Sequence, residues 1–223
     1  MPERDGGPRD DAPAGPQHYF SADPGVASRP AGVDLVLPDL HLRLATDRGV
    51  FSAERVDLGT RVLLESVPPP PARGRLLDLG CGYGPIALAM AARAPGASVL
   101  GVDVNTRAVD LARGNAASNH LDNVDFQVVA ADGTPASAAG AAALAGPFDA
   151  LWSNPPIRVG KDALHALLRT WLGRLAPGAQ AHLVVQRNLG ADSLHRWLEE
   201  SGLPTERAAS RAGFRVLRVT APA

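Results

Sequence analysis

From residue 75 to residue 220, short apolar runs alternate with longer segments of helical periodicity, and this pattern constrains the fold more than any other feature. We expect strands at residues 75–79, 98–104, 124–130, 148–153 and 181–186, and helices at residues 85–94, 106–118, 135–144, 161–175 and 193–201. Strands that alternate with helices predict an α/β fold with a doubly wound, mostly parallel sheet. Residues 205–209 and 214–220 predict a closing hairpin, which gives seven strands with an antiparallel last strand. Ligands should then bind beyond the carboxyl ends of the parallel strands.

The segments before this alternation predict a tail and a short extension. Residues 1–32 are rich in proline, glycine and acidic residues, so we expect a disordered tail, followed by one domain over residues 33–223. Residues 35–37 and 40–44 predict a short N-terminal β extension. Asp57 is expected to cap a helix that runs through Leu64. Further along, Pro177-Gly178 is expected to end the helix at 161–175.

Composition limits the classes of function. The 223 residues fit a single domain, and a net charge of −1 gives no global basic field that would indicate nucleic acid. One cysteine, Cys81, cannot form an intramolecular disulfide or a multi-cysteine metal site, and we expect no metal. No apolar run reaches membrane length and the first residues do not resemble a signal peptide. We therefore expect a cytoplasmic protein without a membrane, and a monomer is favoured.

The first predicted strand leads into a glycine-rich loop, Gly80-Cys81-Gly82-Tyr83-Gly84. Glycine permits positive φ and close backbone approach, and the helix that follows offers free N–H groups. The loop lacks the third glycine of the dinucleotide fingerprint, because Gly84 comes one residue early. Asp78, just before the loop, would disfavour a phosphate and suits an ammonium group. The loop therefore predicts a cofactor without phosphate.

Two more acids close the next two predicted strands. Asp103, followed by Val104, could accept hydrogen bonds from a ribose diol. Asp132, followed by Gly133, could receive an adenine amino group. Each acid alone could simply cap a helix. Together with Asp78 they describe a ligand with an amine, a ribose and an adenine, which S-adenosylmethionine combines without phosphate.

The strand at 148–153 ends in Asn154-Pro155-Pro156-Ile157. The prolines fix their own φ near −65° and hold the residue before each of them extended. The result should be a rigid corner whose side-chain amide and backbone carbonyls suit a planar NH2 group. These four residues are the candidate catalytic residues.

The combination of motifs resembles class I S-adenosylmethionine-dependent methyltransferases, and within them the "methyltransferase small" family, which includes ribosomal RNA guanine-N2 methyltransferases. The resemblance covers roughly residues 35–220 and rests on these matching pieces: Gly49-Val50-Phe51-Ser52, Asp57-Leu58-Gly59-Thr60, residues 77–84, residues 153–161 and residues 213–217. It implies a seven-stranded sheet, S-adenosylmethionine as the cofactor and RNA, ribosomal in particular, as the partner.

The resemblance also implies roles for single residues. The loop from Gly80 to Gly84 would hold the methionine part, with Asp103 on the ribose and Asp132 on the adenine. Asn154 would contact both cofactor and target amine. Candidate substrate-binding residues are Phe51, which could close over the cofactor or base, and Arg158, Lys161 and Arg215, which could contact RNA phosphates.

The chain departs from the family pattern in two ways, and other functions stay open. The ribosomal RNA enzymes carry an extra N-terminal domain, whereas we expect only a tail before the domain of this chain. Many N-methyltransferases have Phe or Tyr where Ile157 stands, which argues against a plain adenine-N6 enzyme. The open alternatives are a protein glutamine amide, adenine N6 or a small-molecule amine as substrate, a nicotinamide-dependent oxidoreductase, and a non-catalytic binding module.

Overall fold

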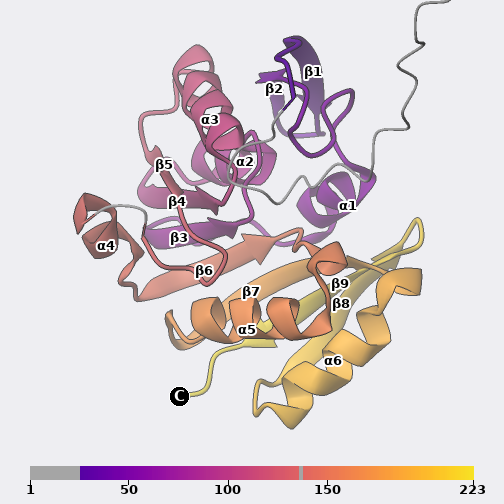
Figure 1. Ribbon diagram of the computed structural model, residues 1–223. Coiled ribbons are helices and arrows are strands. Elements are labelled where there is room, and N and C mark those ends of the chain that lie inside the picture. The colour runs from indigo at the N-terminus through magenta and orange to yellow at the C-terminus, as the bar shows by residue number, and fades with distance from the viewer. Residues whose placement is uncertain (1–25, 136–137) are drawn as a thin grey trace, which may run out of the picture.

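The computed structural model describes residues 26–135 and 138–223, and these residues form three layers with a sheet in the middle (Figure 1). Residues 1–25 of the predicted tail fall outside the described residues, whereas its last two, Ala31 and Gly32, already lie in a strand, so the ordered domain begins earlier than the expected residue 33. The sheet has seven strands in the order β5-β4-β3-β6-β7-β9-β8. Their bounds are β3 (Gly74–Leu79), β4 (Ala97–Asp103), β5 (Val124–Val128), β6 (Phe148–Ser153), β7 (Leu175–Gln186), β8 (Thr205–Arg211) and β9 (Phe214–Thr220).

Neighbouring strands from β5 to β7 run parallel, and β9 pairs antiparallel with both β7 and β8. The predicted doubly wound sheet with an antiparallel last strand is confirmed. The chain order reverses at β3, whose neighbours are β4 and β6. In open α/β sheets such a reversal opens a crevice at the carboxyl ends of the strands.

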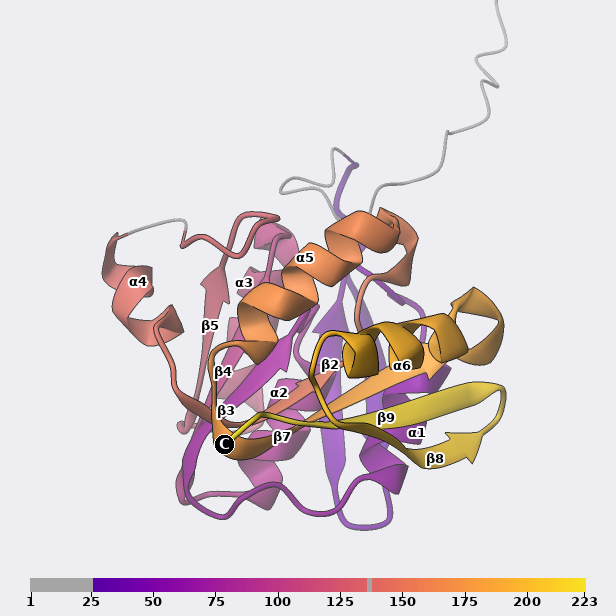
Figure 2. The same cartoon turned by 90° about the horizontal axis from the view of Figure 1, so that it is seen from below.

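Helices cover both faces of the sheet. One face carries α1 (Leu58–Ser66), α2 (Pro85–Arg93), α3 (Thr106–Ser118) and the separate hairpin of β1 (Ala31–Val36) and β2 (His41–Thr46). The other face carries α4 (Ala138–Leu144), α5 (Lys161–Leu172) and α6 (Ala191–Glu200), of which α5 and α6 lie in front of the sheet in Figure 2. Short 3-10 turns, η1 (Ile157–Val159) and η2 (Arg187–Leu189), precede α5 and α6. None of the helices in the described ranges is long and apolar enough to cross a membrane.

The boundary between α5 and β7 differs from the expectation. The helix ends at Leu172, and Pro177-Gly178 lies inside β7 instead of ending the helix. The register between β6 and β7 shifts within the pair: Phe148 lies opposite Leu175, whereas Ala150, two residues later, lies opposite Gln180. The extra residues of β7 form an irregularity in the ladder, which accommodates the proline and glycine.

The β1–β2 hairpin is attached to the rest of the domain through buried asparagines. Asn115 of α3 exchanges hydrogen bonds with the backbone of Ala45 (2.7 and 3.0 Å) and donates to the carbonyl of Tyr83 (2.9 Å). Asn105 donates to the carbonyl of Gly49 over 2.9 Å. The segment between β2 and α1 is thereby fixed beside the glycine-rich loop.

One buried histidine gives the fold a pH dependence. His182 of β7 is 3% exposed, its ring lies edge-on to Trp152, and within the described residues neither ring nitrogen has a hydrogen-bond partner. Burial, together with the charge of Arg218, lowers the pKa of His182 to about 4. The unfolded chain binds this proton near pH 6.5, so folding stability decreases as the pH falls from about 6.5 toward 4.

We expect His182→Leu to remove that part of the pH dependence. Between pH 8 and pH 5 the wild type should lose about 2 kcal/mol of unfolding free energy more than the variant. Denaturant unfolding of both proteins at the two pH values measures the difference. Parallel losses in the two proteins would show that His182 titrates normally in the folded state.

Candidate active site

A cavity of about 360 Å³ lies at the carboxyl ends of β3, β4 and β6, at the reversal of strand order. Its walls include three segments distant in sequence: the glycine-rich loop after β3, the Asn-Pro-Pro corner after β6, and the segment around Phe51 and Asp57 that leads into α1. The sequence predicted the first two as parts of one site, and the structure brings them together.

The glycine-rich loop has the positive-φ backbone that its sequence predicts. The φ angles of Gly80, Gly82 and Gly84 are 75°, 54° and 97°, a region that side chains with a Cβ rarely adopt. A Cβ added at Gly80 or Gly82 would meet no atom within 4 Å, so both positions leave room for a ligand. Gly84 does not line the cavity, and a Cβ there would press on Leu88 and Ala112, so glycine allows close packing at the start of the helix. Its contact with the cofactor stays a prediction.

The remaining loop residues, Cys81 and Tyr83, line the cavity but are almost fully buried. Burial raises the pKa of the Cys81 thiol, and the charges of Asp103 and Asp78 raise it further, so the thiol is no activated nucleophile. Burial and the charge of Asp57 raise the pKa of the Tyr83 hydroxyl as well.

Of the three acids predicted as cofactor contacts, Asp103 is the one that lines the cavity, together with Val104. Its two carboxylate oxygens accept hydrogen bonds from the backbone N–H groups of Gly82 (2.8 Å) and Asn105 (2.9 Å). Burial raises the pKa of Asp103, and although these hydrogen bonds lower it, the net shift is upward. The carboxylate is therefore held in one orientation beside the loop and has lone pairs left. Its contact with a ribose stays a prediction.

Asp78 lies behind the loop and not on the cavity wall. It is fully buried, and one oxygen accepts from the N–H of Ala87 in the first turn of α2 (2.8 Å). Within the described residues its other oxygen has no partner, and burial, with the charge of Asp103, raises the pKa of Asp78 to about 8. The structure gives Asp78 a partner in α2, and its contact with a ligand ammonium stays a prediction.

The predicted adenine contacts Asp132 and Gly133 do not line the cavity, and their contact with an adenine stays a prediction. After β5 the chain makes a turn in which Ala130 donates to the carbonyl of Thr134 (2.9 Å), and the turn exposes Asp132. The Asp132 carboxylate accepts from the N–H and hydroxyl of Thr134. Val129 and Ala130 face the cavity instead and form an apolar wall suited to a flat ring.

The corner after β6 is held tightly to the sheet. The hydroxyl of Ser153 donates to the carbonyl of Leu79 over 2.6 Å, which ties the end of β6 to the end of β3. Pro156 has φ −75° and ψ 76°, and the N–H of Ile157 donates to the Pro155 carbonyl over 2.8 Å, which is an inverse γ-turn. One lone pair of that carbonyl is therefore used within the corner and one remains. All four residues from Asn154 to Ile157 line the cavity.

The amide of Asn154 is oriented by its neighbours. Its nitrogen donates to the Asp57 carboxylate over 2.8 Å and to the Thr60 hydroxyl over 3.2 Å. Within the described residues its oxygen, Oδ1, has no hydrogen-bond partner. The cavity therefore contains a fixed acceptor next to the glycine-rich loop.

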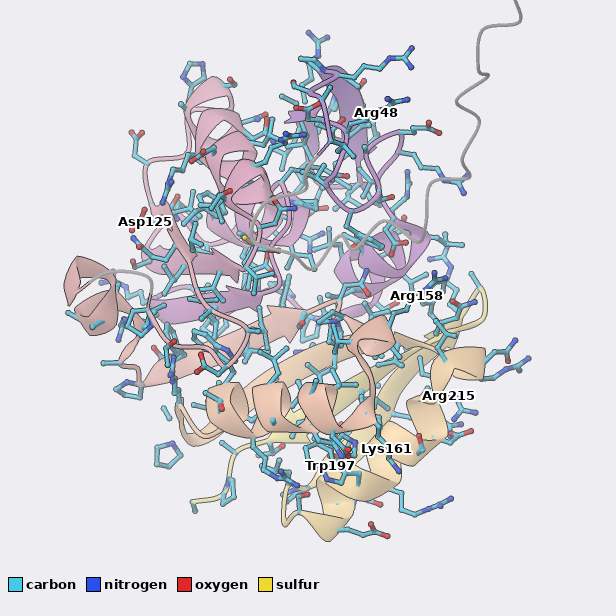
Figure 3. The ribbon with its side chains drawn as sticks, in the orientation of Figure 1. Arg48, Asp125, Arg158, Lys161, Trp197 and Arg215 are labelled. Carbon is cyan, nitrogen blue, oxygen red and sulfur yellow. The ribbon has the colours of Figure 1, made fainter. Side chains whose placement is uncertain are left out.

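The predicted substrate-binding residues divide into two groups. Phe51, 44% exposed, and Arg158 line the cavity. Lys161 and Arg215 do not: Lys161 begins α5 on the α5–α6 side, whereas Arg158 lies nearer to α1 (Figure 3), and Arg215 forms an ion pair with Asp192. A basic residue that lies next to a motif in the sequence need not face the same cavity as the motif, because the sequence does not specify the side of the strand or helix on which its side chain lies.

The sequence interpretation missed Asp57 and Thr60 as site residues, and it missed Phe214. Phe214 lines the cavity from the start of β9, and its ring lies where a Cβ on Gly59 would come within 2.8 Å. The signal available was the run Asp57-Leu58-Gly59-Thr60, which was interpreted as a helix start and as part of the family resemblance, but not as part of the site. Over the described residues no group of three or more His, Cys, Asp or Glu side chains could hold a metal ion.

The cavity fits S-adenosylmethionine: the loop glycines leave space, Asp103 faces inward and the wall by Val129 is apolar.

The sequence matches the family "Methyltransferase small domain" over residues 41–218. It is 35% identical over 184 residues to the "Uncharacterized protein YbxB" of Bacillus subtilis, covering 82% of this chain and 88% of that protein. It is also 35% identical over 183 residues to the "Ribosomal RNA small subunit methyltransferase C" of Aeromonas hydrophila, covering 80% and 49%.

Among solved structures, the fold matches the Thermus thermophilus 16S rRNA N2 G1207 methyltransferase (RsmC), a complex with AdoMet and guanosine. The TM-score is 0.69 at 27% identity, covering 86% of this chain and 50% of that one. The chain thus spans about half the length of the RsmC proteins it matches. It belongs to the methyltransferase small domain family, and its fold and cofactor are those of the class I S-adenosylmethionine-dependent methyltransferases.

Proposed function

We propose that this protein transfers a methyl group from S-adenosylmethionine to the exocyclic N2 amine of a guanine in ribosomal RNA. The observation that carries the proposal is the fixed acceptor at Asn154, beside the loop that receives the cofactor. The printed names of the relatives support the same class of target, since they describe ribosomal RNA methyltransferases and, in one case, an N2 guanine position.

The chemistry requires positioning more than a strong base. When bound, S-adenosylmethionine supplies an electrophilic methyl carbon, which the amine nitrogen attacks as the carbon–sulfur bond breaks. The guanine N2 lone pair is delocalised into the ring and is a poor nucleophile. Asn154 Oδ1 and the remaining lone pair of the Pro155 carbonyl accept the two N–H groups, which favours a pyramidal nitrogen and stabilises its developing positive charge. One amine proton then leaves to water.

The mouth of the cavity offers surfaces for a base and for its phosphate. Phe51 and Phe214 line the cavity and present rings on which an unstacked base can lie, a role that Ile157 cannot fill. Arg158, on the same wall, is placed to meet a neighbouring phosphate. We include in this proposal a cytoplasmic location, where ribosomal RNA is present, and a single monomeric domain that extends from β1, which begins at Ala31, to residue 223.

A direct assay distinguishes the targets. The purified protein is incubated with labelled S-adenosylmethionine and, separately, with naked ribosomal RNA, ribosomal subunits, DNA, a protein release factor and free amines. Digestion and mass spectrometry identify the methylated group. The proposal predicts N2-methylguanosine in ribosomal RNA. Methyl label found instead on adenine N6, on a glutamine amide or on a small amine would contradict guanine N2 as the target and would identify that group as the substrate.

Arg158 provides a test of RNA contact. Arg158→Ala should weaken RNA binding several-fold and reduce the salt dependence of log K by about 0.7–0.9, as expected for one lost phosphate contact. Methylation of free guanosine should change little. Arg215→Ala is the matched control, since Arg215 is paired with Asp192 and lies outside the cavity. Equal effects of the two substitutions would contradict the assignment.

A further inference from the structure

The contact between Asp57 and Asn154 joins residues that are 97 positions apart in the chain. Asp57 precedes α1, and Asn154 follows β6. We propose that Asp57 is a positioning residue that locks the Asn154 amide with its oxygen toward the substrate, so that the site selects a group that donates N–H. The inference rests on the proposed function and adds to it the residue that sets the polarity of the target pocket.

The lock follows from the chemistry of the two groups. A carboxylate only accepts hydrogen bonds, whereas the two ends of an amide differ, one donating and one accepting. The 2.8 Å contact with Asp57 therefore has to be made by the amide nitrogen of Asn154. The reverse orientation would place two acceptor oxygens against each other. Thr60, at 3.2 Å, cannot decide the orientation, because its hydroxyl both donates and accepts.

The carboxylate of Asp57 is itself held by the start of α1. The oxygen that accepts from Asn154 also accepts from the N–H of Thr60 over 3.1 Å, which caps the helix. The helix is anchored in the core by Val62, Leu63 and Leu64, which are at most 2% exposed. Asn154 is thus oriented by a rigid element and not by a mobile loop.

Gly59 completes the arrangement. A Cβ at this position would come within 2.9 Å of the Asp57 carboxylate oxygen and within 2.8 Å of the Phe214 ring. Only glycine lets the carboxylate and the ring both approach this turn of the helix. The run Asp57-Leu58-Gly59-Thr60 thereby supplies the orienting carboxylate, a second partner for the amide and the seat of an aromatic ring in the cavity.

The orientation has a consequence for selectivity. With Oδ1 facing the substrate, the Asn154 amide accepts a hydrogen bond from an amino group. If the amide were rotated by half a turn, its own NH2 would face the substrate and would repel an amino group. The side-chain torsion of asparagine is broad and roughly two-fold, so an unheld amide samples both states. The lock should therefore affect turnover and the preference for an amino-bearing base, and leave cofactor binding nearly unchanged.

The test uses two substitutions of different severity. Asp57→Ser keeps a helix-capping hydroxyl but is too short to hold Asn154, while Asp57→Asn keeps an acceptor oxygen without the charge. We expect kcat to fall about tenfold or more in Asp57→Ser and less in Asp57→Asn, with melting temperature and S-adenosylmethionine affinity close to wild type. Glu65→Gln, which neutralises a carboxylate at the other end of α1, is the control and should leave kcat unchanged.

A binding measurement separates orientation from general damage. Guanosine and inosine differ only in the 2-amino group, so their relative affinity, measured by nuclear magnetic resonance without turnover, reports on the acceptor at Asn154. The wild type should prefer guanosine, and Asp57→Ser should lose most of this preference while Asp57→Asn retains part of it. Full kcat and full preference in Asp57→Ser would overturn the lock. A wild type that shows no preference and methylates no guanine would instead refute the proposed function.

Discussion

Asn154→Ala is expected to lower kcat by about 10² to 10³-fold, the effect typical of removing one preorganised polar group that acts on the transition state. The substitution removes the oxygen that receives the target N–H and leaves the glycine-rich loop and Asp103 untouched. S-adenosylmethionine should still bind within a few-fold of the wild-type affinity, because most of its predicted contacts lie elsewhere in the cavity.

Single-turnover kinetics on ribosomal RNA and calorimetric titration of the cofactor measure the two quantities separately. Thermal unfolding confirms that the variant is folded, and the Asp57 carboxylate retains its bond to Thr60. A variant with unchanged kcat would show that the Asn154 oxygen takes no part in the reaction.

Asp103→Ala is expected to weaken S-adenosylmethionine binding by about 10²-fold or more. Hydrogen bonds to a charged group contribute about 1.5–3 kcal/mol each, and this carboxylate is placed to accept from ribose hydroxyls. The Asp103 carboxylate also accepts from the N–H of Gly82, so its removal should make the glycine-rich loop less ordered as well.

Calorimetry compares this variant with Asp132→Ala, in which the same kind of acid is removed from the end of the next strand. Asp132 is exposed and bonded to Thr134, so its replacement should leave the affinity at the wild-type level. Equal weakening by both substitutions would favour the sequence-based assignment of Asp132 over the position that the structure gives it.

The sequence predicted the elements best where a local signal marks their ends. The helix Thr106–Ser118 and the strand Phe148–Ser153 have the expected bounds, and Asp57 caps α1 as expected. Capping side chains, glycines and prolines act on their immediate neighbours, so their effect is visible in the sequence. The glycine-rich loop, Asp103 and the Asn154 corner were predictable for the same reason, since each is a strand end with its own local chemistry.

The features that escaped prediction depend on contacts between distant segments. Pro177-Gly178 was expected to end a helix, but the pairing of β6 with β7 accommodates it within a strand. Asp132 was expected in the site, but the turn closed by Thr134 directs it to solvent. The contact of Asp57 with Asn154 depends on how α1 packs against β7 and β9, which local sequence does not specify.

The most direct test of the account is the content of modified nucleosides in ribosomal RNA from cells that lack the gene, complemented with the wild type or with Asn154→Ala. Mass spectrometry of each ribosomal RNA should show that one N2-methylguanosine disappears without the gene, returns with the wild type and stays absent with the variant. An N2-methylguanosine content that is the same in all three strains would contradict the assignment of guanine N2 as the target.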